Sequence, residues 1–383
     1  MDAQALYDYS PVLRMMGLGL VIALGPLAWV WLRQRGASSG QRLAALTALT
    51  LFLTFDLVLF GAFTRLTDSG LGCPDWPGCY GSASPIGAHA AISSAQAVMP
   101  TGPVTWSKAW VEMVHRYLAT AVGVLILVLA LASWWQRRRS QVHWVWPWVT
   151  LVWVCLQGAF GAWTVTMKLF PAIVTLHLLG GLGLLALLRV QAVRYGQTLG
   201  TAGGAAAYGA STRRALWWVF GLLCVQIALG GWVSTNYAVL ACRDFPTCQG
   251  SWWPVMDFAR GFEWWRELGQ QGSGEAITFA ALTAIHYTHR LMAYLVLAAL
   301  VALAWHFRRQ GQLRQTRWLW ALAGWQLLTG LSNVVLEWPL VAAVAHTGGA
   351  AALVVALTGW LAEAHPPTLA RNAAPSNPKG HPA

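Results

Sequence analysis

The chain has 383 residues, of which 57% are hydrophobic and only 10% are charged. Because a soluble domain carries roughly a quarter charged residues, this composition excludes an ordinary soluble protein and indicates an integral membrane protein. The net charge of +12 is interpreted as basic loops held against anionic lipid. A nucleic-acid surface is not expected, since no basic segment is long enough to form a groove or an arm.

Apolar runs of roughly 18–25 residues, long enough to cross a bilayer, recur along the chain. We predict nine spanning helices, near residues 14–32, 43–64, 110–133, 144–165, 171–190, 215–236, 279–305, 317–337 and 340–362. The first run could be read as a signal peptide, but it has no small-residue cleavage site, and Arg33 and Arg35 follow it directly. We therefore interpret it as an uncleaved helix.

The basic residues predict the orientation of these helices. With Arg33 placed inside, the alternate loops on that side collect 16 of the 25 Lys and Arg residues. Cytoplasmic loops carry the excess of Lys and Arg in membrane proteins. The N-terminus is therefore expected outside and the C-terminus in the cytoplasm, with residues 363–383 as a disordered tail.

The two long outer loops, about 65–109 and 237–278, begin with similar cysteine pairs. The first reads C-P-D-W-P-G-C and the second C-R-D-F-P-T-C, which place Cys73 with Cys79 and Cys242 with Cys248. Outer loops face an oxidising compartment, where disulfides persist. We expect one disulfide in each loop, and we consider zinc the weaker alternative because each loop offers too few ligands.

The cysteine pairs belong to a longer internal repeat. The first pair and the second are 169 residues apart, and the same offset relates Gly61 to Gly230, Gln157 to Gln326, Gly161 to Gly330 and His177 to His346. We predict an all-α polytopic membrane protein made of two tandem four-helix bundles, related by a pseudo-two-fold axis along the membrane normal. The halves are residues 43–195 and 215–362, and residues 1–42 form an extra helix with a basic inner loop.

Four histidines occupy repeated positions inside helices, namely His115, His177, His289 and His346. We expect them at similar depth, about 9–15 Å below the outer surface, because a helix rises ~1.5 Å per residue. A single buried histidine is usually a hydrogen-bonded core residue. Two facing imidazoles in each of two four-helix bundles instead suit haem iron, and the additional Cys or carboxylate ligands of other metal sites are missing at this depth.

The residues beside these histidines suggest further roles. Arg116 and Arg290 follow a histidine directly, and they either pair with haem propionates or extend to lipid headgroups. Glu112 breaks the symmetry, because the corresponding residue of the second half is His286. This carboxylate either handles protons at a reacting centre or only pairs with Arg116 or caps its helix. Asp56, inside another helix, has no repeat partner and receives no role.

Together these motifs resemble the haem A synthases of aerobic respiration, over about residues 43–362. The likeness rests on F-G-A-F-T-R-L-T-D-S-G-L-G-C-P-D-W-P-G-C-Y-G (60–81), E-M-V-H-R (112–116), T-H-R (288–290) and the two remaining helical histidines, His177 and His346. The chain departs from the eight-helix pattern of that family by its extra N-terminal helix and its long outer loops.

The resemblance implies a role for the four histidines and for Glu112. His289 and His346 would hold a haem b cofactor. Arg116 and Arg290 are candidate cofactor-binding residues from their positions after the histidines, not from the resemblance. His115 and His177 would hold the substrate haem O, and Glu112 would act with them in catalysis. The C8 methyl of haem O would be oxidised to the formyl group of haem A through successive hydroxylations. The family also implies disulfides between the matching outer-loop cysteines.

The resemblance further implies the bacterial cytoplasmic (inner) membrane as the location. The farnesyltransferase that makes haem O and the cytochrome oxidase that uses haem A are the implied partners, and a homo-oligomer is compatible with the sequence. Two other functions stay open: a di-haem b-type electron-transfer cytochrome that does no chemistry on its haem, and a haem carrier that binds haem through its outer loops.

Overall fold

The protein is an all-helical bundle. The computed structural model describes residues 10–138, 144–200 and 208–364, and within these ranges it contains α-helices, one 3-10 helix and only isolated β-bridges. The predicted all-α polytopic class is confirmed. The expected disordered tail, 363–383, lies outside the described residues apart from the end of the last helix.

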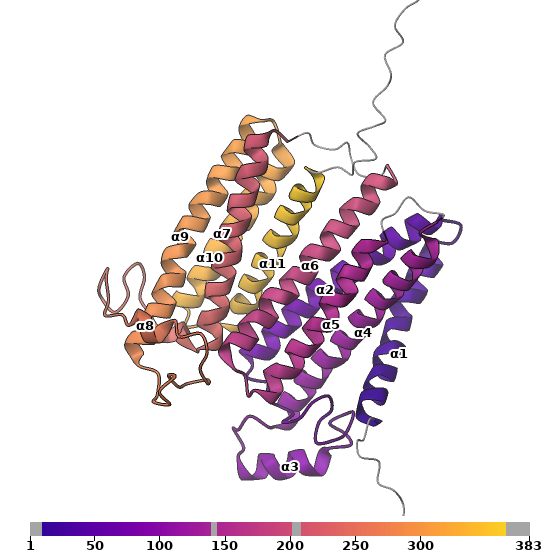
Figure 1. The fold of residues 1–383 in the computed structure, drawn as a ribbon. Helices are drawn as coiled ribbons and strands as arrows, with labels where there is room; N and C mark the ends of the chain where they lie inside the picture. Colours follow the sequence, from indigo (N-terminus) through magenta and orange to yellow (C-terminus); the bar gives the residue numbers. More distant parts are fainter. Residues whose placement is uncertain (1–9, 139–143, 201–207, 365–383) are drawn as a thin grey trace, which may run out of the picture.

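In the described part of the chain, nine long helices run along the bundle (Figure 1). They are α1 Ser10–Arg33, α2 Ser39–Leu66, α4 Trp106–Gln136, α5 Val145–Thr166, α6 Pro171–Thr198, α7 Ala210–Thr235, α9 Phe279–Arg309, α10 Leu313–Val335 and α11 Leu340–Glu363. Each overlaps one predicted span. Eight are long and apolar enough to cross a membrane. The ninth, α10, is less apolar, since it carries Gln326 and Asn333 along its length as well as Arg314 and Arg317 near its start.

Short helices interrupt the two long loops at one end of the bundle. They are α3 His89–Val98 in the first loop, and η1 Ala238–Ala241 and α8 Phe258–Gly261 in the second. Figure 1 shows α3 and α8 at the same end of the molecule. We call this end, which also carries both cysteine pairs, the disulfide end, and we call the opposite end the basic end.

The long helices after α1 form two rings of four. In the N-terminal half α2 contacts α4 and α6, and α5 contacts α4 and α6; in the C-terminal half α7 contacts α9 and α11, and α10 contacts α9 and α11. Between the halves α6 contacts α11, while α6–α7 and α11–α2 form two further contacts. If each helix of one half is exchanged with its equivalent in the other half (α2 with α7, α4 with α9, α5 with α10 and α6 with α11), the same set of helix–helix contacts results. The predicted pseudo-two-fold axis requires this.

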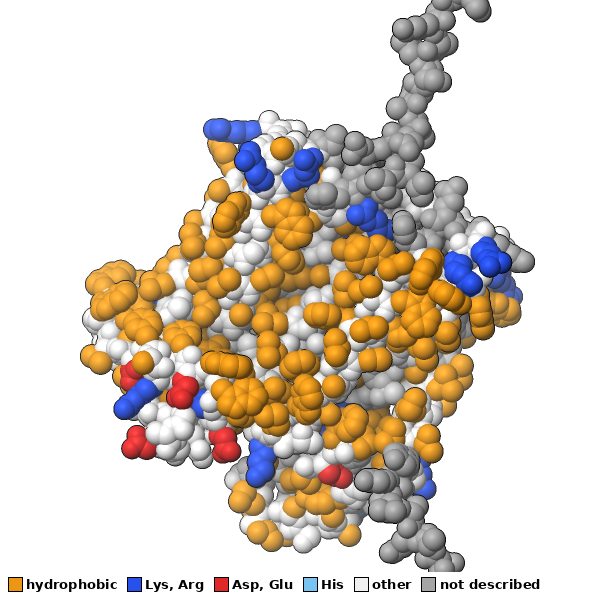
Figure 2. Space-filling view, viewed as in Figure 1, with side chains coloured by type: hydrophobic (Ala, Val, Ile, Leu, Met, Phe, Trp, Pro, Cys, Tyr) orange, Lys and Arg blue, Asp and Glu red, His pale blue; other side chains and the backbone are white. Residues whose placement is uncertain are grey.

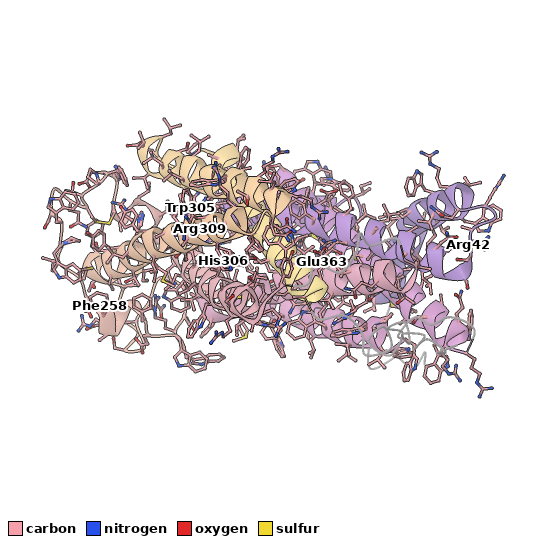
Figure 3. The ribbon with its side chains drawn as sticks, turned by 90° about the horizontal axis from the view of Figure 1, so that it is seen from above. Arg42, Phe258, Trp305, His306, Arg309 and Glu363 are labelled. Atoms are coloured by element: carbon pink, nitrogen blue, oxygen red, sulfur yellow. A yellow bond between two sulfur atoms is a disulfide. The ribbon has the colours of Figure 1, made fainter. Side chains whose placement is uncertain are left out.

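The interface between the halves is apolar in the middle and polar at both ends. Leu182 and Leu185 of α6 lie in the same buried cluster as Leu353 and Leu357 of α11. Near the basic end, Arg189 of α6 forms an ion pair of 3.8 Å with Glu363 of α11, which is labelled in the view from above (Figure 3).

The extra helix α1 lies at the far edge of the N-terminal half. It packs along α4 and, less extensively, along α2, and Gly19 allows a close approach: a Cβ atom there would lie 2.5 Å from Thr120 Cγ2. In Figure 1 the C-terminal half is on the other side of the bundle. The helix therefore adds to the outer wall of one half without disturbing the eight-helix repeat.

The surface is that of an integral membrane protein. A broad band of hydrophobic side chains covers the face shown in Figure 2, with Lys and Arg at both ends of the band and the visible Asp and Glu at the disulfide end. Large side chains in this band are exposed, including Trp218 at 75% and Val152 at 60%. Side chains of this size and polarity are stable at such exposure when lipid, and not water, surrounds them.

Candidate functional site

The four repeated histidines lie at matched positions of four helices. His115 is the tenth residue of α4 and His289 the eleventh of α9, while His177 and His346 are each the seventh residue of α6 and α11. Matching threonine caps set the start of α4 and α9: Thr105 accepts a hydrogen bond from Lys108 N, and Thr278 accepts one from Ala281 N. α4 thus begins four residues earlier than predicted, which gives His115 and His289 nearly equal depth.

Each histidine ring lies against a glycine of the preceding long helix. A Cβ atom built on each glycine would meet the Cε1 atom of the facing ring, at 3.1 Å for Gly61 and His115, 3.5 Å for Gly161 and His177, 2.9 Å for Gly230 and His289, and 3.2 Å for Gly330 and His346. These are the glycines that the repeat offset relates. At Gly61, Gly230 and Gly330 the repeated glycine therefore has a steric reason, because a Cβ atom would press on the imidazole, whereas Gly161 leaves room for ordinary contact.

The imidazole nitrogens are suited to accept a ligand. Within the described residues, the buried Nδ1 atoms of His115, His177 and His289 have no hydrogen-bond partner. The rings themselves are only partly buried, and the two of each half are near enough to interact electrostatically. Buried polar atoms of this kind require a partner. A haem iron between two imidazoles would take one nitrogen of each ring.

A bare metal ion is not indicated. Nowhere in the described ranges do three or more His, Cys, Asp or Glu side chains gather into a group that could hold an ion. Phe60 stacks on His115 with ring centroids 6.2 Å apart and planes within 6°, so the surroundings of this ring are aromatic. Paired imidazoles among apolar and aromatic side chains fit a flat macrocycle better than a hydrated cation.

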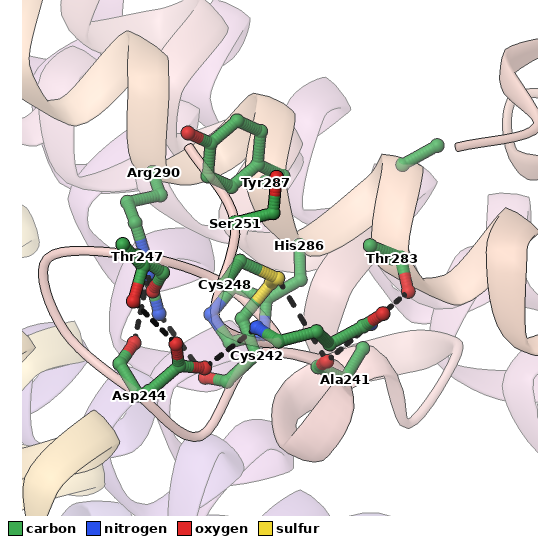
Figure 4. The surroundings of a disulfide bond; sticks show 12 residues. Ala241, Cys242, Asp244, Thr247, Cys248, Ser251, Thr283, His286, Tyr287 and Arg290 are labelled. Atoms are coloured by element: carbon green, nitrogen blue, oxygen red, sulfur yellow. Dashed lines mark hydrogen bonds between the residues drawn. A yellow bond between two sulfur atoms is a disulfide. The ribbon is translucent and has the colours of Figure 1, made fainter. Parts of the chain in front are cut away.

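Arg290 ties the second disulfide loop to α9 (Figure 4). Its Nη1 donates to Asp244 O at 2.9 Å and Thr247 O at 2.7 Å, and its Nη2 donates to Cys242 O at 3.1 Å. The Cys242–Cys248 disulfide is present as predicted. Arg290 is 6% exposed, so this cation is compensated by carbonyl dipoles of the loop.

The Asp244 side chain organises the same loop from within. It accepts hydrogen bonds from the Thr247 hydroxyl at 2.6 Å, Gln249 N at 2.7 Å and Gly250 N at 3.0 Å. The hydroxyl of Thr247, followed by these backbone donors, lowers the pKa of Asp244 to about 2. The carboxylate is therefore ionised at any physiological pH, and it holds the turn that follows Cys248.

The first disulfide loop is built in the same way. Arg116 Nη1 donates to Asp75 O at 3.0 Å, Pro77 O at 3.1 Å and Gly78 O at 2.5 Å. The Asp75 carboxylate accepts from Tyr80 N and Gly81 N, and the predicted Cys73–Cys79 disulfide is present. Both arginines thus bind backbone carbonyls of the loops, and Arg116 also pairs with Glu112 of its own helix. Their pairing with propionates stays a prediction.

Glu112 and His286 occupy equivalent positions, but Glu112 accepts a hydrogen bond from a backbone N–H whereas His286 donates one to a backbone carbonyl. Glu112 is 4% exposed; its Oε2 accepts from Cys73 N at 2.7 Å, and its Oε1 accepts from Arg116 Nη2 at 2.5 Å. The ring of His286 donates from Nδ1 to Ala238 O at 3.1 Å, since a carbonyl can only accept. The first half therefore carries a buried anion three residues before its histidine, and the second half carries none there.

A polar cluster at the disulfide end of the interface escaped the sequence reasoning. Arg65 donates from Nη2 to Ser234 O at 2.6 Å and from Nη1 to the Tyr237 hydroxyl at 2.9 Å, and that hydroxyl donates to Asp68 Oδ1 at 2.8 Å. The signal was present in the sequence. The offset of 169 relates Arg65 to Ser234 and Asp68 to Tyr237, so these residues meet across the pseudo-two-fold axis.

Asp56 remains without a role. It is exposed on the outside of α2, and in the part of the chain that the structure describes it makes no hydrogen bond or ion pair. Gly61, five residues further along α2, is the residue that faces His115. The two positions are about 140° apart around the helix, at 100° per residue, so Asp56 points away from the histidine pair.

The fold and the histidine pairs define a repeated helical membrane protein with one candidate haem site in each half. Residues 44–358 match the family of cytochrome oxidase assembly proteins, and the chain belongs to this family. The resemblance inferred from the motifs is thereby confirmed.

The relatives cover nearly the whole repeat. The chain is 38% identical over 321 residues to the haem A synthase of Shewanella oneidensis, covering 83% of this chain and 95% of the relative. It is 27% identical over 358 residues to the haem A synthase of Hyphomonas neptunium, covering 88% and 93%. For the haem A synthase of Halalkalibacterium halodurans the identity is 26% over 301 residues, covering 76% and 86%.

Proposed function

We propose that this protein is a haem A synthase, which oxidises the C8 methyl group of haem O to the formyl group of haem A for cytochrome oxidase assembly. Membership of the family supports the role in oxidase assembly, and the name of the most similar relatives quoted above supports the product. Successive hydroxylations of one methyl carbon convert it to a formyl group. Overall this change removes four electrons and four protons when water is counted as the oxygen donor.

The observation that carries this proposal is a symmetric pair of sites with one asymmetric carboxylate. Both halves present two facing histidines against two glycines, but only the N-terminal half has a buried anion, Glu112, three residues before a histidine. An electron carrier needs only ligands at both sites. A site that removes protons from its substrate benefits from a base.

The C-terminal half fits a resident haem b. His289 and His346 would hold its iron through one ring nitrogen each. When bound, this group supplies reversible one-electron transfer. The two halves share an apolar interface through α6 and α11, so the residues that position one site are packed directly against those of the other.

The N-terminal half would hold haem O as the substrate between His115 and His177. Glu112 lies on the same face of α4 as His115, three residues before it. Its carboxylate accepts hydrogen bonds from Cys73 N and from Arg116, and these donors stabilise the charged form.

Arg116 has a positioning role in this scheme. Its guanidinium joins Glu112 to three carbonyls of the first loop. The loop therefore covers the carboxylate and excludes water from it, and the ion pair fixes the direction of both its oxygens. Removal of Arg116 would free the loop and the base together.

We place the protein in the bacterial cytoplasmic membrane with its N-terminus outside and its C-terminus in the cytoplasm. Two disulfides at one end support exposure of that end to an oxidising compartment, and the arginines at the other end support a cytoplasmic location for it. The expected partners are the farnesyltransferase that supplies haem O and the oxidase that takes up haem A.

The test is haem extraction and chromatography from membranes of a host that makes haem O, with and without this protein. Haem A, or its hydroxymethyl intermediate, is expected only when the protein is present, and it should be absent with Glu112→Gln. Unchanged haem O beside a purified protein with a low-spin b-type spectrum would overturn the proposal in favour of an electron-transfer cytochrome.

A further inference from the structure

The ligand histidines of the two halves differ in their second hydrogen bond. His346 Nδ1 lies 2.9 Å from Thr329 Oγ1 of α10. The equivalent histidine of the first half, His177, has a buried Nδ1 atom without a partner among the described residues. The repeat offset of 169 relates Thr329 to Phe160, so the first half has an aromatic ring in place of the hydroxyl.

The direction of the hydrogen bond at Thr329 follows from its second contact. The hydroxyl donates to Trp325 O, one turn earlier in α10, at 2.7 Å. A hydroxyl has one proton, so its oxygen is left to accept from His346 and the imidazole carries its proton on Nδ1. A neutral ring of this tautomer presents a lone pair at Nε2, which is the form that ligates iron.

The surroundings of His346 keep this arrangement in place. Gly330, next to Thr329, faces the ring of His346 closely: a Cβ atom there would lie 3.2 Å from Cε1, tighter than an ordinary contact. Gln326 Nε2 donates to the backbone carbonyl of His346 at 3.1 Å. One face of α10 thus fixes the backbone, the position and the tautomer of this histidine.

The position of Phe160 gives His177 no such support. The ring of Phe160 packs edge-on against Trp163 with centroids 5.2 Å apart, and it can neither donate nor accept a conventional hydrogen bond. Gly161 still faces the imidazole, but with more space, since a Cβ atom there would lie 3.5 Å from His177 Cε1. Among the described residues, no hydrogen bond to Nδ1 fixes the tautomer of this ring.

We propose that Thr329 is a positioning residue that makes His346 a permanent haem ligand, and that Phe160 leaves His177 as an exchangeable one. The inference rests on the proposed function, in which the C-terminal half retains its haem while the N-terminal half takes up haem O and releases haem A. A site that must exchange its haem needs a weaker ligand than a site that keeps one. An outer partner of a metal-bound histidine typically changes metal affinity by about 10- to 100-fold.

The first test measures haem release from the purified full-length protein, using excess apomyoglobin as the acceptor. Thr329→Val keeps the shape of the side chain but removes the hydroxyl, and it should release haem b about 10- to 100-fold faster than the wild type. Thr329→Ser should restore slow release. Ser332→Ala removes a similar bond to the helix backbone, that of Ser332 to Leu328 O, and should have no effect.

The midpoint potential of haem b is a second measurement. A general structural defect would not shift this potential in a predictable direction, whereas the loss of the Thr329 hydrogen bond should. A histidine that donates from Nδ1 is a more basic ligand and stabilises ferric iron. The midpoint potential of haem b should therefore rise in Thr329→Val and return in Thr329→Ser. Equal release rates and equal potentials in the wild type and Thr329→Val would overturn the proposal.

The reciprocal test uses the N-terminal half and does not depend on how Thr329→Val folds. Phe160→Thr and Phe160→Val leave the same space, but only the first offers a hydroxyl to His177. Haem O loaded into this half should leave more slowly from Phe160→Thr than from Phe160→Val, and equal rates would contradict the inference. If His346→Ala keeps its haem b, the ligand assignment of the proposed function is wrong instead.

Discussion

Alanine substitutions at the four ring-facing glycines should have graded effects that follow from the distances. A carbon–carbon contact is most favourable near 3.5–4.0 Å. A Cβ atom would lie 2.9 Å from the ring at Gly230, 3.1 Å at Gly61, 3.2 Å at Gly330 and 3.5 Å at Gly161. The overlap is therefore about 0.6 Å or more at Gly230, about half that at Gly330, and absent at Gly161.

These distances convert into an expected order of stability and haem content. Overpacking of this kind typically costs about 1–3 kcal/mol, whereas replacing glycine by alanine inside a helix gains about 0.5–1 kcal/mol when space is available. Gly230→Ala should therefore be destabilised and lose haem b, because His289 must move. Gly161→Ala should be neutral or slightly stabilised, and Gly61→Ala and Gly330→Ala should lie between.

The assay is the same for all four variants. Each is purified in detergent, its haem absorbance per chain is recorded, and its thermal unfolding midpoint is measured. Gly161→Ala is the matched control, because it makes the same chemical change at the position with the most space. Equal losses in all four variants, or the largest loss in Gly161→Ala, would refute the claim that close glycine–imidazole packing positions the ligands.

Three further predictions concern the carboxylate and the loops. Glu112→Gln should keep haem in both halves but form no haem A, because an amide still accepts from Cys73 N but is a poor base. Haem content and product chromatography measure both outcomes, and normal turnover would remove Glu112 from the mechanism. Arg290→Met should raise the rate at which a phosphine reduces the Cys242–Cys248 disulfide by at least about tenfold, since several loop carbonyls lose a charged donor worth about 1.5–3 kcal/mol each. An unchanged reduction rate would contradict the role of these contacts in holding the loop. For Asp244, the folded pKa of about 2 lies below the ordinary 3.8, so its contribution to loop stability should be complete above pH ~4 and lost as the pH falls towards 2. The Cys242–Cys248 disulfide should therefore become easier to reduce over that range, and Asp244→Asn should show the low-pH level of reducibility already at pH 7. A wild-type pH profile of disulfide reduction in Asp244→Asn would refute this role of Asp244.

Much of the fold was predictable because a bilayer restricts the backbone so strongly. In hydrocarbon every peptide group must be paired within its own helix, so long apolar runs specify spanning helices directly. The repeat offset then predicted which helices are equivalent. The α6–α7 and α2–α11 contacts between the halves are equivalent under this repeat, as expected for a pseudo-two-fold axis. His177 and His346 and both cysteine pairs share this offset, and His115 and His289 follow at an offset of 174 residues, because the second outer loop is longer.

The polar contacts at the disulfide end were less accessible to sequence reasoning. The sequence suggested that Arg116 and Arg290 face propionates or lipid, whereas their donors bind carbonyls of loops about 40 residues away. Carbonyl groups are the same at every position of a chain, so no pattern of side chains reveals where they converge. For Glu112 the alternative of pairing with Arg116 is observed, and the structure adds Cys73 N as a second partner.

Two other features required the three-dimensional structure. The short helices α3 and α8 lie in loops without apolar periodicity long enough to predict them. The difference between Thr329 and Phe160 was visible in the aligned repeat, but its meaning depended on the contact with His346, a residue of another helix. Repeats identify equivalent positions, and departures from the repeat indicate where two similar sites are adapted to different tasks.

The most direct test of the account is the haem composition of purified His115→Ala and His289→Ala beside the wild type. The account predicts that His289→Ala loses haem b, and that His115→Ala keeps haem b but no longer binds haem O. Loss of the same haem in both variants, or retention of haem b in His289→Ala, would contradict the assignment of one half to the cofactor and the other to the substrate.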